Sequence, residues 1–339
     1  MRDVPVRPAL LCGALLIAVV FATSYHSPSL TTARTSLDAS ELPESMVSGP
    51  NGELVVVRQG DTFADVVVYD RALAQRSHVM LGFFSPGLAI DTTGRLYFAG
   101  DVGIWTVRHL VEVYTTDFVH LSTWSWQPDQ TIDLDGSPDG TVVMMRGATK
   151  WDRTHLRDGT VHRITRQSVE GRVLDAWRGP SSAYALAVAP TGAVYVVRND
   201  GDGGPVVERF DADGSPLGSF PIDGKLAGWD FAADGTLFAV LPSEAKGSQV
   251  IRYRIDGADV DVIDRWQTCD WARDLAVTTD GRVHVAAIGD APFTGMICTY
   301  EPDGRLRGQT LLPDHTGIIT QRPTEPGTRS WLPTVFKRR

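Results

Sequence analysis

Short apolar runs separated by glycine turns recur along most of the chain. One copy reads LAVAPTGAVYVV, residues 186–197, and five other segments share its order of apolar run, turn and apolar run. The turn glycines follow one another at steps of 42, 46, 52, 43 and 46 residues, as Gly52, Gly94, Gly140, Gly192, Gly235 and Gly281. A large apolar residue stands six positions before each glycine, as Met46, Leu88, Leu134, Leu186, Trp229 and Leu275. Self-similarity at this period is typical of an array of repeated structural units.

Each copy predicts two antiparallel strands joined by a tight turn. The residue before the glycine is Asn, Asp or Thr, and Asn-Gly and Asp-Gly favour the left-handed backbone of a two-residue hairpin turn. The flanking runs are continuously apolar, which predicts strands covered on both faces. A second hairpin follows about 22 residues later in the last three copies, with its turn at Gly214, Gly257 and Gly304. The third copy has a looser version, and the first two keep only the strand pattern.

Four antiparallel strands in a repeat of about 45 residues are typical of a propeller blade. The sequence therefore predicts an all-β fold, a six-bladed β-propeller over residues 41–320, followed by a C-terminal tail over 321–339 that closes or packs on the ring. Two ways of closing the ring stay open. The chain after Leu312 could add a strand to blade 1, or residues 36–41 could complete blade 6.

The N-terminus predicts export. Arg2 and Arg7 precede an uncharged apolar stretch over residues 9–22, which fits the core of a signal peptide. The uncharged stretch reaches the length of a spanning helix only when its flanking residues are counted, so residues 1–26 are either a cleaved signal peptide or a membrane anchor. Residues 27–40 are then a flexible polar linker. We expect an extracytoplasmic protein, secreted or attached to the membrane.

The amino-acid composition and the net charge limit the kinds of partner that the protein can bind. The formal net charge is −9 with no block of like charges, which argues against nucleic acid as a partner. The chain has 28 Arg but only 4 Lys, and this bias indicates a GC-rich bacterial genome rather than an arginine-rich function. Cys269 and Cys298 fall in the sixth repeat, where they are either a disulfide or two unpaired buried thiols. We expect a monomer.

Two segments carry a family resemblance. Residues 186–220, LAVAPTGAVYVVRNDGDGGPVVERFDADGSPLGSF, resemble a repeat of the NHL type. Residues 42–57, LPESMVSGPNGELVVV, resemble the opening blade of NHL, streptogramin-lyase-like or SMP-30/gluconolactonase-like propellers. The resemblance covers roughly residues 41–312 and implies architecture more than activity, because such propellers serve as enzymes, sensors and binding platforms.

The resemblance directs attention to the top face of the propeller, where the inner strand of each blade begins. Eight positions before the turn glycine, the six copies carry Glu44, Pro86, Ile132, Tyr184, Ala227 and Arg273. In SMP-30-like lactonases this ring resembles a divalent-metal site built from Glu, Asn and Asp. Glu44 matches the first ligand, but Tyr184 and Ala227 stand where Asn and Asp are expected. One carboxylate cannot hold a calcium ion, which weakens the lactonase interpretation.

A second set of acids lies on the innermost strands. Asp133 and Asp274 stand seven positions before the turn glycine, and Asp135 and Asp230 stand five before it, in otherwise apolar slots. An acid there costs several kcal/mol unless it is paired or bound to a metal. These four and Glu44 are the catalytic candidates, and Glu44, Asp135 and Asp230 are the candidate metal ligands. The alternative is that the aspartates accept hydrogen bonds between blades.

Basic and aromatic residues predict a binding rim. Six positions after the glycine, three copies carry Arg58, Arg146 and Arg198, which with Arg273 could grip a carboxylate, a phosphate or an acidic peptide. Alternatively, they neutralise aspartates such as Asp101 and Asp133. The long loop over residues 146–159 adds Trp151, and Tyr184 completes the candidate ligand-binding set. The segment 199–204, NDGDGG, resembles a calcium loop but serves equally as a turn.

These observations leave two functional hypotheses and a third, structural one, in which the N-terminal linker and the C-terminal tail merely display the propeller at the cell envelope. The leading one is an exported or membrane-anchored binding or sensing platform, which holds a protein or a small anionic ligand at its top face and needs no cofactor. The alternative is a metal-dependent hydrolase or lyase of the SMP-30/gluconolactonase type, using Ca²⁺ or another divalent metal with an atypical carboxylate set. No nucleophile elbow, phosphate loop or dinucleotide fingerprint appears in the sequence.

Overall fold

The computed structural model describes residues 42–59, 64–81, 84–102, 108–126, 130–147, 161–201, 204–242, 247–289 and 295–312. All of them belong to the second of two compact units, Asp38–Arg339. The expected signal or anchor segment, the linker, the C-terminal tail and both segments proposed to close the ring lie outside the described residues. Among the residues described, no helix is long and apolar enough to cross a membrane.

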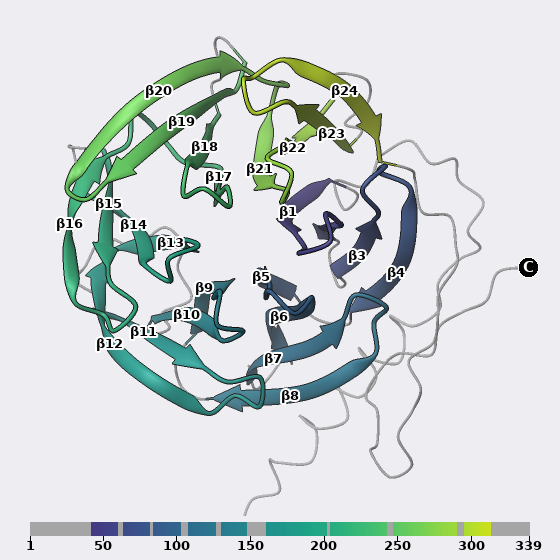
Figure 1. The fold of residues 1–339 in the computed structure, drawn as a ribbon. Helices are drawn as coiled ribbons and strands as arrows, with labels where there is room; N and C mark the ends of the chain where they lie inside the picture. Colours follow the sequence, from purple (N-terminus) through teal and green to yellow (C-terminus); the bar gives the residue numbers. More distant parts are fainter. Residues whose placement is uncertain are drawn as a thin grey trace, which may run out of the picture. The chain divides into compact units, whose positions relative to one another are not determined.

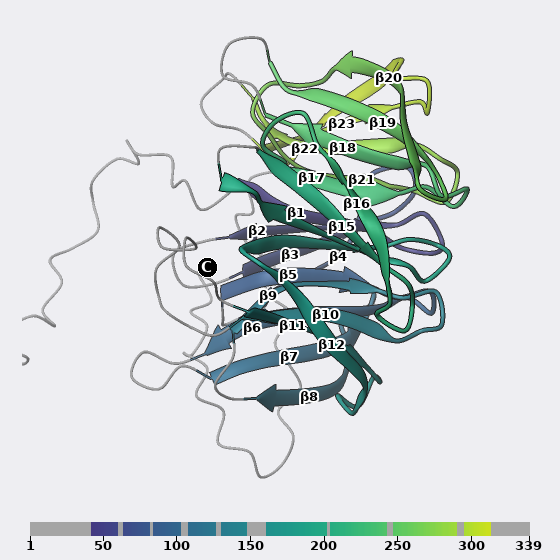
Figure 2. The ribbon, with the colours of Figure 1, turned by 90° about the vertical axis from the view of Figure 1, so that its left-hand side faces the viewer.

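The described strands form six antiparallel sheets, each of four strands that are consecutive in the chain. Figure 1 shows the sheets as blades of a ring, and Figure 2 shows the ring from the side with its short hairpins gathered on one face. The chain is a six-bladed β-propeller, and the predicted fold class is confirmed.

The strands of the first three blades are bounded as follows. Blade 1 contains β1 (Pro43–Ser48), β2 (Leu54–Gln59), β3 (Ala64–Tyr69) and β4 (Gln75–Leu81). Blade 2 contains β5 (Phe84–Ile90), β6 (Arg95–Val102), β7 (Arg108–Thr115) and β8 (His120–Trp126). Blade 3 contains β9 (Gln130–Gly136), β10 (Val142–Gly147), β11 (Val161–Gln167) and β12 (Val173–Ser181).

The last three blades follow the same plan. Blade 4 contains β13 (Ala183–Val188), β14 (Val194–Asn199), β15 (Pro205–Phe210) and β16 (Pro216–Pro221). Blade 5 contains β17 (Gly228–Phe231), β18 (Leu237–Leu241), β19 (Gln249–Asp256) and β20 (Asp259–Gln267). Blade 6 contains β21 (Ala272–Val277), β22 (Val283–Ile288), β23 (Gly295–Tyr300) and β24 (Leu306–Leu311).

The turn glycines adopt the predicted left-handed backbone, but the turns are longer than two residues. Gly52 has a φ of 80°, and the other five turn glycines lie between 78° and 85°. In blade 1 the Gly52 N–H donates to the Gly49 carbonyl, and the Gly49 N–H donates to the Glu53 carbonyl. This is a hydrogen-bonded turn closed by a left-handed glycine, a loop that also matches the twist of the flanking strands.

Blades 1 and 2 make their second hairpin without the glycine that marks it elsewhere. Leu73, with a φ of 61°, and Phe118, with a φ of 58°, take the left-handed position that Gly171, Gly214 and Gly304 occupy in blades 3, 4 and 6. Their N–H groups close the same turn by donating to the carbonyls of Asp70 and Thr115. No turn glycine marks these two hairpins in the sequence, because two bulky residues adopt the strained left-handed backbone instead.

The core is divided into six clusters, each lying between two successive blades. Between blades 1 and 2, for example, Val55, Val57 and Val66 pack against Leu88 and Phe98. All six large apolar residues that precede the turn glycines by six positions are buried, as the pattern requires. Burial on both faces of every blade explains why the strands are continuously apolar.

Contacts among the described residues join blade 6 to blade 1. Because every described sheet consists of consecutive strands, no described strand is shared between these two blades. The Met46 N–H donates to Asp274 Oδ2 at 2.6 Å, and Ser48 Oγ donates to the Val277 carbonyl at 2.6 Å. An apolar cluster that includes Met46, Val56 and Ile297 fills the space between the blades.

Arginines link three of the blades to the next one around the ring. Arg166 donates to the Ala212 carbonyl at 2.9 Å, and Arg252 donates to the Pro302 carbonyl at 2.9 Å. Arg209 makes the same link to Gly257. Each of these arginines stands five positions before the glycine of the second hairpin in its blade. The spacing is therefore a sequence signal for these contacts between blades.

Candidate functional site

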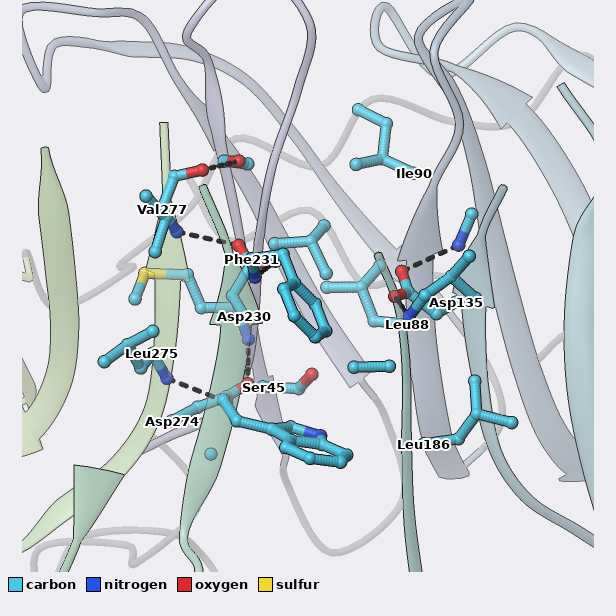
Figure 3. A pocket seen from close by; sticks show the side chains of 18 of the residues that line it. Ser45, Leu88, Ile90, Asp135, Leu186, Asp230, Phe231, Asp274, Leu275 and Val277 are labelled. Carbon is cyan, nitrogen blue, oxygen red and sulfur yellow. Dashed lines mark hydrogen bonds between the residues drawn. The ribbon is translucent and has the colours of Figure 1, made fainter. Parts of the chain in front are cut away.

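A cavity of about 500 Å³ lies at the centre of the propeller and is lined by the inner strands of all six blades. It reaches from Glu44 and Tyr184, near the start of the inner strands, to Pro50 and Pro138 in the turns. Figure 3 shows part of its wall, including Asp135, Asp230 and Asp274. The four aspartates singled out in the sequence all line this cavity.

The two aspartates of blade 3 join that blade to blade 4. Asp133 accepts a hydrogen bond from its own neighbour, the Leu134 N–H, at 2.9 Å, and another from the Leu186 N–H of blade 4 at 2.7 Å. Asp135 repeats the arrangement two residues later, since it accepts from Gly136 of its own strand and from Val188 of blade 4, both at 2.7 Å. Both carboxylates therefore act as clamps between adjacent inner strands.

Asp230 and Asp274 form the same clamp at two further blade junctions. Asp230 accepts from the N–H of the residue that follows it and from the Val277 N–H of blade 6, both at 2.7 Å. Asp274 accepts from Leu275 at 2.8 Å and from Met46 of blade 1 at 2.6 Å. The interpretation of these acids as inter-blade hydrogen-bond acceptors therefore describes their contacts.

Two glycines allow the inner strands to approach this closely. A Cβ on Gly228 would overlap Asp274 Oδ1, and a Cβ on Gly136 would overlap the carbonyl oxygen of Ile90 in blade 2. The second contact is with backbone, which cannot rotate away as a side chain can. Three junctions of the inner ring therefore carry a carboxylate clamp, and Gly136 allows a close approach at a fourth, between blades 2 and 3.

Burial raises the pKa of all four clamping carboxyls. It raises the pKa of Asp133 and of Asp230 to about 7 and that of Asp274 to about 8, although backbone N–H groups that bind each carboxylate oppose the shift. The pKa of Asp135 is raised well above its usual value by burial and, further, by the negative charge of Asp230. The four acids thus share one electrostatic environment.

These pKa shifts predict that stability falls as the pH rises. A carboxyl with a raised folded-state pKa binds its proton more tightly when folded than when unfolded, where its pKa is about 3.9. Its contribution is complete below about pH 4 and is lost as the pH rises through about 7 to 8. We expect the melting temperature to fall from about pH 5 to pH 8 at constant ionic strength, with a shallower slope in Asp133→Asn, which cannot titrate. An equal slope in the variant would contradict the assignment.

β-Bulges place the residues at the top of the inner strands. The strand register shifts between Pro43 and Ser45, between Ala183 and Ala185, and between Ala272 and Asp274. The residues left over are Glu44, Tyr184 and Arg273, three of the six members of the ring that stands eight positions before the turn glycine. Bulges commonly redirect side chains at functional sites. Sequence spacing located this ring but gave no sign of the bulges.

The ring residues differ in their exposure. Glu44 and Arg273 are exposed, whereas Tyr184 is half-buried and lines the cavity with Glu44 and Ile132. Burial raises the pKa of Tyr184, and a hydrogen bond with the Leu226 backbone opposes the shift. Arg273 makes no interaction with another described residue. The exposed part of the ring thus combines one carboxylate with one guanidinium that no described residue binds.

The three arginines that share the sixth position after the glycine have different surroundings. Arg58 is only 2% exposed and is bound to Asp65, which also contacts His78, so Arg58 belongs to the interior of blade 1. Arg198 is bound to Asp200 and Glu208 of its own blade. Neither arginine is bound to a clamping aspartate.

Arg146 is half-buried at the end of β10. It occupies the same repeat position as Arg58 and Arg198. The segment that follows it in the sequence contains Trp151. Trp151 and the side chain of Asp101 lie outside the described residues, as does part of the segment 199–204. The structure therefore brings the aspartates together around the cavity but does not gather the arginines of the expected rim into one described cluster.

A disulfide joins Cys269 to Cys298 and fixes the loop that leads into blade 6. Trp271, two residues after Cys269, is 58% exposed and has a left-handed backbone with a φ of 53°. Sequence reasoning missed it because a single tryptophan before a strand looks like any buried aromatic residue. Its position two residues before the ring residue Arg273 was the only signal in the sequence.

Within the described ranges, no three His, Cys, Asp or Glu side chains are grouped as a metal ion requires. The cavity acids are spread over three blade junctions, with each carboxylate bound to two backbone N–H groups.

The fold is similar to several solved structures at low sequence identity. Hydrazine synthase from Kuenenia stuttgartiensis is 14% identical, with 81% of each chain covered and a TM-score of 0.53. Virginiamycin B lyase from Staphylococcus aureus is 12% identical, with 83% of this chain and 87% of that chain covered and a TM-score of 0.51. A protein of unknown function from Bacteroides caccae is 12% identical, with 73% and 89% covered and a TM-score of 0.52.

At this identity the likeness shows the propeller fold alone. No protein-family model matches the chain, and no curated protein matches it either. The finer resemblance to NHL and SMP-30-like repeats stays a prediction, and the function has to be argued from the site.

Proposed function

We propose that this propeller is an exported or membrane-attached binding protein that holds an acidic partner at its top face. The observation that carries the proposal is Trp271, an exposed indole on a loop that the structure fixes from several sides. Arg273, the exposed ring residue two positions later, supplies the positive charge. The partner is an acidic peptide segment or a small anionic ligand.

The loop around Trp271 is held rigidly while the indole stays outside. The Thr268 N–H donates to the Ser248 carbonyl at 2.8 Å, and the Ala272 N–H donates to Ser248 Oγ at 3.0 Å. The disulfide at Cys269 adds a covalent link. A left-handed backbone costs a residue such as Trp roughly 1–2 kcal/mol. A fold that accepts this cost without burying the indole has a preorganised aromatic anchor, which loses little entropy on binding.

Arg273 suits an acidic partner because its guanidinium is exposed and unpaired among the described residues. A guanidinium binds carboxylates and phosphates through two parallel hydrogen bonds. Trp and Arg together are typical of the residues that dominate binding energy at interfaces.

The contacts of the cavity acids favour binding over metal-dependent hydrolysis. A hydrolase of that kind needs several carboxylates converging on one ion, whereas each clamping aspartate binds one N–H of its own strand and one of the next blade. Loss of these hydrogen bonds would be the cost of turning the carboxylates toward a metal.

The disulfide supports the expected location. Disulfides persist mainly in oxidising compartments outside the cytoplasm. Cys269–Cys298 fits the export that the N-terminal sequence predicts.

Binding of acidic peptides tests the proposal. We expect Trp271→Ala and Arg273→Gln each to weaken the binding of a glutamate-rich peptide about ten-fold, measured by fluorescence anisotropy, because an interface anchor and a charged hydrogen bond are each worth about 1.4 kcal/mol or more. Matched controls are Leu306→Ala, an exposed apolar residue of β24, and Arg254→Gln, an exposed arginine of β19. Unchanged binding in both top-face variants, with unchanged melting temperatures, would reject the proposed surface.

A further inference from the structure

The top face carries a second exposed cation that the proposed binding surface does not use. Lys225 lies in the loop between β16 and β17 and is the only lysine among the described residues. It is exposed, and no described residue forms an ion pair with it. The nearest acid in the sequence does not neutralise it, because Asp223 is bound to Arg265 at 2.6 Å. A positive charge therefore stands at the entrance to blade 5.

The repeat places Lys225 where blade 6 has Trp271. Both residues stand ten positions before the turn glycine of their blade, which is Gly235 for Lys225 and Gly281 for Trp271. Both are exposed and come two positions before the ring residue, whereas the equivalent residue of blade 4, Ser182, is half-buried. Equivalent positions of a repeat lie on the same face of the assembly. Lys225 therefore belongs to the same top face as Trp271.

The inner strands of blades 5 and 6 meet just below these two residues. Figure 1 shows β17 and β21 side by side near the centre of the ring. A Cβ on Gly228 would lie 2.7 Å from the Cα of Asp274, so the strands touch at the seventh position before each turn glycine. Lys225 and Trp271 each stand three residues before this contact, and three residues span at most about 11 Å. One bound peptide can therefore reach both loops.

The loop of Lys225 is fixed at the mouth of the cavity. Leu226, directly after Lys225, is only 6% exposed and lines the cavity. The next residue is held as well, because the Ala227 N–H donates to the Val240 carbonyl at 2.9 Å. A lysine on a fixed backbone loses mainly side-chain freedom when a partner binds, which keeps the entropic cost of the contact low.

The charges on the two sides of Arg273 differ in sign. On one side lies blade 1, whose exposed ring residue is Glu44 and whose inner strand is bound to that of blade 6 by the hydrogen bond from Met46 to Asp274. On the other side lies blade 5, which presents Lys225. An acidic partner held at Arg273 is therefore matched by charge toward blade 5 rather than toward blade 1.

We propose that the top-face surface extends over blade 5 to Lys225 and binds an extended peptide with two acidic residues separated by an uncharged apolar segment. The inference rests on the proposed function, whose anchors are Trp271 and Arg273. Arg273 binds one acid, Lys225 binds the other, and Trp271 packs against the segment between them. That segment is uncharged because Asp270, the exposed acid directly before Trp271, would repel a further negative charge.

The separation of the two cations favours a peptide over a small ligand with one acidic group. Because Arg273 directly precedes Asp274, the contact between β17 and β21 limits the distance between the Cα atoms of Lys225 and Arg273 to about 20 Å at most. An extended peptide covers this distance with about six residues. The two acids of the partner are therefore separated by no more than about six residues.

Peptides with one or two acids test the surface. The probes are capped peptides in which two glutamates are separated by two, four or six uncharged residues that include leucine, together with the same peptides after replacement of either glutamate by glutamine. Calorimetry with the full chain should show at least one two-acid peptide binding about three- to five-fold more tightly than both of its one-acid forms, as expected for an added exposed charge pair. The difference should shrink at high salt, which screens exposed charges. Equal binding of two-acid and one-acid peptides at every spacing would overturn the proposal.

Variants at Lys225 locate the second acid. Lys225→Met removes the charge, and should weaken binding of the two-acid peptide to the level of its one-acid forms while leaving at least one of those forms unaffected. Lys225→Arg keeps the charge and should preserve the advantage of the two-acid peptide. Arg305→Met, which removes an exposed charge from the second hairpin of blade 6, is the matched control and should change no affinity. An equal loss for all three peptides in Lys225→Met would indicate a general effect of charge and would reject the second contact.

The same peptides separate this inference from the proposal on which it rests. Trp271→Ala should weaken the binding of every peptide, whether it has one acid or two. If Trp271→Ala weakens binding but Lys225→Met does not, the top-face site stands and its extension to Lys225 is wrong. If neither variant weakens binding and both keep the melting temperature of the parent protein, both proposals fail.

Discussion

Replacing Asp274 by alanine is expected to lower the free energy of unfolding by about 2–5 kcal/mol. The substitution leaves the Met46 and Leu275 N–H groups without their acceptor, and each unsatisfied buried donor costs roughly 1–3 kcal/mol. The effect is large because Asp274 joins blades 6 and 1, the one pair of neighbouring blades that are not consecutive in the sequence. Urea denaturation followed by tryptophan fluorescence measures the loss.

Two variants separate the clamp from the charge. Asp274→Asn keeps one acceptor oxygen, and should lose less than half as much stability as alanine while flattening the pH dependence. Asp261→Ala removes an exposed acid and should change stability by no more than about 0.5 kcal/mol. An Asp274→Ala protein as stable as the Asp261→Ala control would show that the clamp contributes nothing to closure.

Removing the disulfide is expected to cost about 3–4 kcal/mol. The bond closes a loop over a sequence separation of 29 residues, and the entropy that such a loop removes from the unfolded chain corresponds to this amount. The double variant Cys269→Ala, Cys298→Ala should therefore unfold at a lower urea concentration than the oxidised parent protein.

Reduction provides the control for that prediction. Dithiothreitol should bring the parent protein toward the midpoint of the double variant and should leave the double variant unchanged. Loss of the bond should also weaken binding at the top face, because Trp271 lies on the loop that the bond fixes. A urea midpoint of the parent protein that does not change with dithiothreitol would contradict a stabilising role for the bond.

The repeat made most of the fold predictable. Each blade buries both faces, so the apolar pattern and its turn glycines had to recur at every copy, and the period alone implied a ring of six blades. The glycine pattern did not predict a turn where a residue other than glycine adopts the left-handed backbone. Leu73 and Phe118 take left-handed positions that no propensity rule would assign to them, and the second hairpins of blades 1 and 2 were correspondingly hard to see.

The candidate site was predictable in part. Asp133, Asp135, Asp230 and Asp274 stood out because an acid in an apolar slot demands a partner, and the partners are backbone groups of the next blade. The environment of Arg58 could not be read in the same way. Its burial depends on Asp65 and His78, which come from two other strands and share no spacing rule with it.

Two tryptophans show a second limit on what the sequence can predict about the site. Trp229 occupies a repeat position that is apolar in every copy, so nothing in the sequence indicated that its indole N–H would be buried without a hydrogen-bond partner. Trp271 lies outside the repeat pattern, and only the structure distinguishes its exposed indole from the buried aromatic residues of the blades.

The consecutive order of the strands in every described sheet has a consequence for how the ring can be divided. A backbone break at residues 181–182, between β12 and β13, would cut no sheet and would leave three whole blades on either side. The fragments would meet again through side-chain contacts, among them the two carboxylate clamps of blade 3. Co-expressed halves of the chain should thus recombine without exchanging a strand, and the propeller is a set of interlocking modules that the peptide chain keeps in order.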